Sequence, residues 1–185
     1  MSAARIAASR RFGEEWSSIF WRESSRCELL AACFPLSATA DSLAKFRGGI
    51  GVIPVSSGQG TATTATVVNR NIVRGVQPPG QIWVIADLRA DVRDDGRVTV
   101  DGRGLLLGGG NNIGTNANQS VRATLLCAND GNVLHDSGLV PLAANGDFRI
   151  DDMLSPAPPN QCDSAVLLIR NMGGSWFAAG LPKDN

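Results

Sequence analysis

Residues 83–101 read WVIADLRADVRDDGRVTVD, and this stretch decides the fold class. Apolar side chains occupy every second position of its first half: Val84, Ala86, Leu88, Ala90 and Val92. The Asp-Asp-Gly sequence at 94–96 is hairpin-turn chemistry, and residues 97–101 supply a returning strand. Alternation with a period of two, followed by a tight turn, predicts an antiparallel β-hairpin.

The chain beyond this hairpin repeats the same signals. Gly, Asn and Asp clusters at 129–132 and 145–146 predict two more turns, with short strands between them. Residues 156–160, PAPPN, predict a rigid crossing segment before an apolar strand at 164–170. Turns about every 8–12 residues are typical of sandwiches and small barrels. We therefore expect residues 61–185 to be all-β, forming an Ig-like antiparallel β-sandwich of about seven or eight short strands.

The first 60 residues differ in composition and are expected to form a poorly ordered extension. They contain all four glutamates of the chain. A helical spacing of aromatic and apolar side chains predicts a short amphipathic helix within residues 12–27. Residues 34–63 are small, polar and glycine-rich, which predicts a linker. Residues 61–68 are rich in Thr and Val, which predicts a strand at the end of that linker.

Two short motifs in the extension resemble parts of bacterial export signals. Residues 9–11, Ser-Arg-Arg, resemble the start of a twin-arginine signal, and residues 30–33, LAAC, resemble a lipobox. Charged side chains between them interrupt the apolar core that a signal peptide needs. The alternatives are a defective leader and a mis-assigned start. No apolar run approaches about 18–20 residues, so we expect no transmembrane segment.

Charge and histidine content exclude several function classes. The formal net charge is zero and the pI is about 6.6, so no global field attracts nucleic acid or an anionic membrane. His135 is the single histidine, so a multi-histidine metal site cannot form within one chain and a catalytic triad would have to use it. Its sequence context predicts an exposed hairpin histidine. We expect no enzyme activity and no cofactor.

The cysteines of the C-terminal half predict one disulfide. Cys127 ends a predicted strand, and Cys162 precedes the apolar strand at 164–170. A bridge between them would close a loop of about 35 residues and stabilise the domain by roughly 3–4 kcal/mol. The alternative is two unpaired buried thiols. Neither cysteine pair has C-x₂-C spacing, which disfavours a metal site.

Two further groups are candidate ligand contacts. Aspartates in the decisive hairpin, Asp91, Asp94 and Asp95 foremost, carry the oxygen ligands that calcium prefers. Interleaved arginines favour surface ion pairs instead. Trp83 and Trp176 could stack on sugar rings if exposed, although core packing is the commoner role.

Several short motifs resemble a group of small secreted bacterial proteins of unknown function. They are VRATLLC at 121–127, the cysteine before AVLLIR at 165–170, and WFAAG at 176–180. The resemblance covers residues 65–182 and implies an exported, disulfide-bonded β-sandwich with no assigned activity. The poor leader departs from the group's pattern.

Together these patterns favour a non-enzymatic exported protein. We expect a structural or interaction module, extracellular or periplasmic, with a protein or cell-surface partner. The alternative is a carbohydrate- or calcium-binding module. Calcium titration and sugar binding distinguish the two.

Overall fold

A computed structural model describes residues 40–59 and 67–183. In this part of the chain regular structure is almost entirely β-strand, with one short 3-10 turn, η1 (Ala128–Asp130). The all-β prediction is confirmed. The main sheet has nine strands: β1 (Ser42–Gly51), β5 (Asp87–Arg93), β6 (Arg97–Arg103), β8 (Ser120–Leu126), β9 (His135–Asp136), β10 (Val140–Pro141), β11 (Phe148–Met153), β12 (Val166–Asn171) and β13 (Trp176–Lys183).

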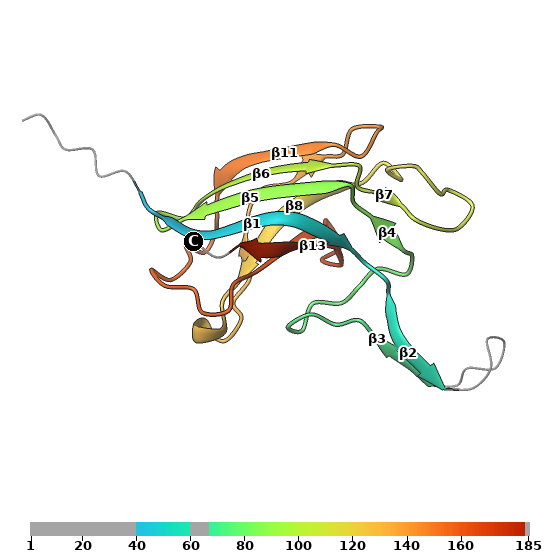
Figure 1. Cartoon of the computed structure of the whole chain (residues 1–185), viewed down its shortest axis with the longest axis horizontal. Coiled ribbons are helices and arrows are strands. Elements are labelled where there is room, and N and C mark those ends of the chain that lie inside the picture. The colour runs from blue at the N-terminus through green and yellow to red at the C-terminus, as the bar shows by residue number, and fades with distance from the viewer. Residues whose placement is uncertain (1–39, 60–66, 184–185) are drawn as a thin grey trace, which may run out of the picture. The chain divides into compact units, whose positions relative to one another are not determined.

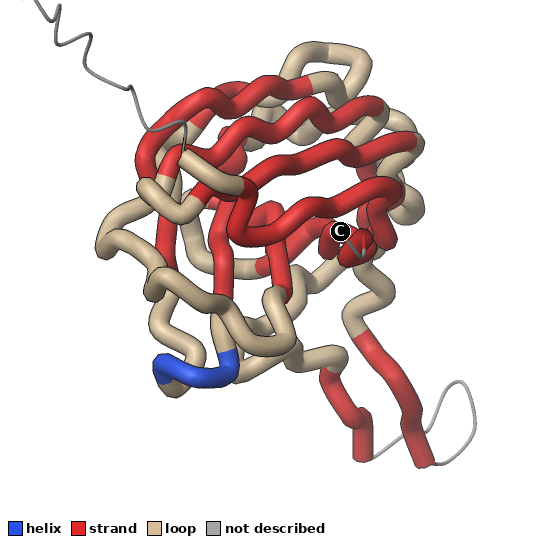
Figure 2. The backbone as a smooth tube through the Cα atoms, turned by 60° about the vertical axis from the view of Figure 1, so that its left-hand side comes forward, coloured by secondary structure: helices blue, strands red, loops and turns tan. Residues whose placement is uncertain are grey.

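The main sheet is antiparallel and strongly curled. Its strand order is β10-β8-β12-β13-β1-β5-β6-β11, with β9 beside β8. Figure 1 shows the part of the sheet formed by β13, β1, β5, β6 and β11. Figure 2 shows the curvature, which brings the two ends of the sheet toward each other. Asp136 of β9 and Ser155, just beyond β11, exchange two backbone hydrogen bonds of 3.1 and 2.9 Å across the gap. The curl encloses one apolar core.

Alternate side chains of the strands fill this core, as a period of two requires. From one half of the sheet come Phe46, Leu88, Val92, Val98, Val100 and Ile150, and from the other Ala123, Leu125, Leu167 and Ile169. Burial of each large aliphatic or aromatic side chain among them stabilises the fold by about 1.5–3 kcal/mol. The intervening positions of β1, β5, β6 and β11 carry charged or polar side chains outward.

The linker predicted for residues 34–63 is wrong where the structure describes it. Residues 42–51 form β1, which lies in the middle of the main sheet between β13 and β5. Its glycines serve close packing: a Cβ on Gly49 would lie 2.9 Å from Leu88 Cβ, and one on Gly51 would lie 2.2 Å from the Trp83 carbonyl oxygen. Glycine content was therefore a poor guide to flexibility here.

The single strand predicted over the first half of the decisive hairpin is in fact two. β4 (Trp83–Val84) pairs with β7 (Leu106–Leu107) outside the main sheet, and β5 begins at Asp87. The alternation changes phase at the break: Trp83 is buried and Val84 exposed, whereas Leu88 and Val92 are buried. The β5–β6 hairpin itself is as predicted, with the Gly96 amide donating to the Arg93 carbonyl at 3.0 Å.

A second small sheet pairs β2 (Val55–Gln59) with β3 (Val67–Arg70) and stands apart from the main sheet (Figure 2). The helix predicted within residues 12–27, the export-signal motifs, and most of the strand predicted at 61–68 lie outside the described residues. Among the described residues, no helix is long and apolar enough to cross a membrane.

The turn at Gly146 yields the first prediction. Gly146 has φ +81°, and a Cβ there would lie 2.6 Å from the Leu105 amide nitrogen and 2.7 Å from the Leu105 carbonyl oxygen. We expect Gly146→Ala to lower the free energy of unfolding by about 2 kcal/mol, because strain and overpacking combine. Gly131→Ala, at φ +77° with nothing within 4 Å, should cost about 1 kcal/mol. Urea denaturation measures both, and equal losses would contradict the packing argument.

Candidate functional site

Four adjacent strands of the main sheet, β1, β5, β6 and β11, present two rows of polar side chains on their outer face. One row runs across the strands as Arg47, Arg89, Asp101 and Arg149, each directly opposite the next. The neighbouring row runs as Lys45, Asp91, Thr99 and Asp151. Alternation along each strand places these side chains outside while their neighbours fill the core.

The two rows, apart from Asp151, line a shallow hollow of about 270 Å³. Four basic side chains border it (Lys45, Arg47, Arg89, Arg149), against two acidic ones (Asp91, Asp101). Neighbouring strands lie about 4.8 Å apart, so Arg47 and Arg149 are separated by three strand spacings, about 14 Å. We call this surface the arginine hollow.

The charges of the arginine hollow are incompletely paired. Arg47 and Arg149 make no ion pair within the described residues. Arg89 contacts Asp87 on its own strand at 3.3 Å, in an exposed pair. The Asp101 carboxylate lies 3.3 Å from Arg103. Arg47 stands directly opposite Arg89, and like charges in that relation destabilise a sheet.

A second pair of arginines on neighbouring strands shows how this fold compensates two positive charges that lie opposite each other. Arg122 of β8 is directly opposite Arg170 of β12. Asp136 places its carboxylate between them, 3.1 Å from Arg170 Nη1 and 3.5 Å from Arg122 Nη1. Thr124 Oγ1 also donates to Asp136, at 2.6 Å. The Arg47–Arg89 pair has no such carboxylate among the described residues.

The calcium candidates do not converge. Asp91 accepts a hydrogen bond from the Ser42 hydroxyl. The Asp95 carboxylate accepts from the Arg97 amide at 2.9 Å, and the Asp94 amide donates to the Asp41 carbonyl, as turn residues do. In the described part of the chain, the group of acidic, cysteine and histidine side chains close enough to share an ion is a different one: Cys127, Asp130 and His135.

Trp83 and Trp176 are core residues. Their exposed fractions are 4% and 3%, which excludes stacking of either ring on a surface ligand in this conformation. Trp83 stacks on Phe177 with ring centroids 4.0 Å apart, and Trp176 Nε1 donates to the Asn71 carbonyl at 3.0 Å. Their interpretation as ligand contacts is therefore wrong, and core packing is the role observed.

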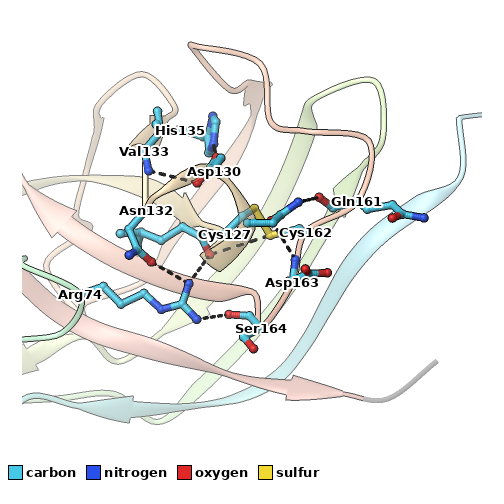
Figure 3. The surroundings of a disulfide bond; sticks show 12 residues. Arg74, Cys127, Asp130, Asn132, Val133, His135, Gln161, Cys162, Asp163 and Ser164 are labelled. Atoms are coloured by element: carbon cyan, nitrogen blue, oxygen red, sulfur yellow. Dashed lines mark hydrogen bonds and ion pairs between the residues drawn. A yellow bond between two sulfur atoms is a disulfide. The ribbon is translucent and has the colours of Figure 1, made fainter.

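Cys127 and Cys162, the predicted pair, lie at disulfide distance with sulfur atoms 1.96 Å apart (Figure 3). The bridge joins the end of β8 to the segment before β12, two strands that pair with each other. Arg74 reinforces the same region by donating from its guanidinium to Asn132 Oδ1 at 3.0 Å and to the Ser164 carbonyl.

The exposed position predicted for His135 is wrong. Its side chain is only 3% exposed because β9 turns inward against the segment after β11. Nδ1 lies 2.8 Å from the Pro156 carbonyl oxygen, and Nε2 lies 2.6 Å from Asp130 Oδ2. Both ring nitrogens are thus occupied by oxygen partners from the surrounding chain.

This contact predicts an acid dependence of stability. The hydrogen bond from His135 lowers the pKa of Asp130 below its ordinary value of 3.8, against the opposing effect of burial. A lowered pKa in the folded state means that the ionised carboxylate stabilises the fold above about pH 4, and that this contribution is lost as the pH falls through the lowered pKa. We expect Asp130→Asn to be less stable than the wild type at about pH 5 and the difference to shrink toward about pH 2. Urea midpoints across this range measure it, and a constant difference would contradict the assignment.

Comparison with protein-family models, curated proteins and solved structures yields no match. The candidate site therefore rests on geometry alone. The sequence analysis did not bring the three arginines of the hollow together in one site. Arg89 was interpreted as part of a surface pairing pattern, Arg47 fell within the predicted linker, and Arg149 had no signal of its own.

Proposed function

We propose that this chain is an exported, non-enzymatic interaction module that binds carboxylate groups of a cell-surface partner in the arginine hollow. The observation that carries the proposal is the contrast between the two cross-strand arginine pairs. Arg122 and Arg170 share the Asp136 carboxylate, whereas Arg47 and Arg89 share none: Arg89 contacts Asp87 in an exposed pair on its own strand, and Arg47 makes no ion pair within the described residues. A carboxylate from a partner would complete the second pair as Asp136 completes the first.

The chemistry of the hollow supports a carboxylate ligand. Guanidinium groups bind planar carboxylates through two parallel hydrogen bonds. An exposed arginine–carboxylate pair contributes only about 0.2–1 kcal/mol, so a single carboxylate would bind weakly. Arginines spread over about 14 Å favour a partner with repeated carboxylates, because linked contacts bind with a high effective concentration.

A neutral sugar, the ligand of the alternative carbohydrate-binding proposal, has less support. The aromatic side chains of the described residues (Phe46, Trp83, Phe148, Trp176, Phe177) are all buried, and sugar rings bind to exposed aromatic faces. A carbohydrate ligand would therefore be an acidic one.

The environment of His135 supports a non-enzymatic role. Its two nitrogens are already hydrogen-bonded to Pro156 and Asp130, so neither is available as a general base in this conformation. The Cys127–Cys162 pair supports export, since disulfides persist in oxidising compartments. The resemblance to small secreted bacterial proteins agrees with both proposals.

An Ig-like sandwich remains our proposal for the finer architecture. In that description β8, β12 and β13 form one layer and β1, β5, β6 and β11 the other. In the structure the layers are continuous through the pairing of β13 with β1. Rapid hydrogen exchange at the amides that join β13 to β1 would support two separate layers.

Binding to carboxylate polymers tests the proposed function. We expect the oxidised protein to bind polyglutamate or polygalacturonate and not to bind dextran. The acidic polymer that binds with the higher affinity indicates whether the partner is a peptide or a glycan. Affinity should fall with salt because the contacts are exposed. Arg47→Ala/Arg89→Ala should weaken binding about tenfold, since two contacts of about 0.7 kcal/mol each sum to about 1.4 kcal/mol.

The matched control is Arg93→Ala, an exposed arginine of β5 that does not line the hollow. It removes one positive charge, against two in the double variant, and should change affinity less than twofold. Equal losses in both variants, or binding of dextran, would contradict the proposed function.

A further inference from the structure

Four side chains with metal-ligand chemistry meet where β8 ends. The Cys127 sulfur, an Asp130 carboxylate oxygen and a His135 ring nitrogen lie within 4.8 Å of one another. The Cys162 sulfur adjoins the Cys127 sulfur. Figure 3 shows His135 and Asp130 on the same side of the cysteine pair. Two cysteines, a histidine and an aspartate form a ligand set of the kind that binds zinc.

The hydrogen bonds of His135 orient its ring as metal-bound histidines are oriented. Nδ1 must donate, because its partner is the Pro156 carbonyl oxygen at 2.8 Å. Nε2 is then the nitrogen that faces Asp130, and it can bind a metal ion once the proton between it and that carboxylate is released. Metal-bound histidines commonly donate their other N–H to a carbonyl or a carboxylate in this way.

We propose that reduction of the Cys127–Cys162 bond converts this cluster into a four-coordinate zinc site. The ligands are Cys127 Sγ, Cys162 Sγ, His135 Nε2 and one oxygen of Asp130. Zn–S bonds are about 2.3 Å, so the sulfurs of a tetrahedral site lie about 3.8 Å apart, the separation of two non-bonded sulfur atoms. The inference is independent of the arginine hollow, which lies on other strands.

The chemistry balances with a dithiol or phosphine as the reductant. The reductant supplies two electrons, which break the S–S bond, and two protons then give two thiols. A dithiol is itself oxidised to a disulfide. A phosphine is oxidised to the phosphine oxide, whose oxygen comes from water. Zinc binding releases both thiol protons and the proton between His135 Nε2 and Asp130. The disulfide bond and a bound zinc ion are therefore alternative links between the end of β8 and the segment before β12.

Cobalt(II) titration of the reduced full-length chain tests the proposal. Cys27 and Cys33 are first replaced by serine, so that other thiols do not compete. We expect one equivalent of cobalt to give the visible bands of a tetrahedral thiolate site, zinc to displace it, and the oxidised protein to give no such bands. Zinc should also raise the melting temperature of the reduced protein. Absence of the bands, or displacement without any gain in melting temperature, would overturn the proposal.

Asp130→Asn tests the site itself, because it keeps both thiols and His135 and removes only the carboxylate that contacts His135 Nε2. We expect zinc affinity to fall at least tenfold. The control Asp163→Asn removes an exposed carboxylate beside Cys162 and should change affinity less than twofold. Equal affinities in the two variants would show that the cysteines bind the ion without the cluster, and the proposal would fail. Polymer binding by the oxidised protein is unaffected by either outcome.

Discussion

Replacing Asp136 by alanine is expected to lower the free energy of unfolding by about 3 kcal/mol, since removing the acidic partner of a largely buried ion pair leaves an uncompensated charge. Arg170 is 9% exposed and directs Nη1 at Asp136, and Arg122 approaches the same carboxylate. Without it, two guanidinium groups face each other across paired strands. The Arg170 Nε–Gly174 hydrogen bond does not neutralise that repulsion.

Asp151→Ala is the control for this prediction. Asp151 accepts two hydrogen bonds of 3.0 Å from Arg97, but both partners are nearly half exposed. An exposed pair contributes about 0.2–1 kcal/mol, so the loss should stay below about 1 kcal/mol. Chemical denaturation of the two variants gives the comparison. Equal losses would mean that Asp136 does not stabilise the arginine pair as described.

The double variant Cys127→Ala/Cys162→Ala is expected to lose about 3–4 kcal/mol of stability. The bridge joins residues 35 apart in sequence, and its removal restores loop entropy to the unfolded chain. The β8–β12 pairing and the hydrogen bonds around Asn129 and Asp163 remain, so the variant should still fold. Denaturation with and without a dithiol measures the effect.

Two observations check this prediction. The reductant should destabilise the wild type and leave the double variant unchanged. Under denaturing conditions, the wild-type chain of four cysteines should show no more than two free thiols. Four free thiols would contradict both the bridge and the proposed export.

Local chemistry explains what could be predicted from the sequence. The turn at 94–96 requires no distant partner, because Asp and Gly supply its backbone conformation themselves. The Cys127–Cys162 pair could be predicted for a related reason, since both residues flank apolar strands that pair with each other. Alternation within β5 then assigned Leu88, Ala90 and Val92 correctly to the core face.

Long-range packing explains what could not be predicted. The glycines of β1 resembled a linker, yet Gly49 and Gly51 permit close contact with Leu88 and Trp83. His135 is buried because of residues about twenty positions away, around Pro156. Neither contact leaves a signal in the neighbouring sequence.

The arginine hollow illustrates the same limit at the candidate site. Arg47, Arg89 and Arg149 come from three separate strands, and only the strand order and register place them in one row. Each alone is an ordinary exposed arginine. Their shared row becomes visible only when β1 and β11 are placed on either side of the β5–β6 hairpin.

The most direct test of carboxylate binding is an NMR titration of the ¹⁵N-labelled, oxidised protein with polyglutamate, following the side-chain Nε–Hε signals of arginine. The proposed function predicts the largest shifts at Arg47, Arg89 and Arg149, with backbone amide shifts confined to β1, β5, β6 and β11. Arg122 and Arg170, already paired with Asp136, should move little. Shifts that are absent from the hollow, or that concentrate at Arg122 and Arg170, would contradict it.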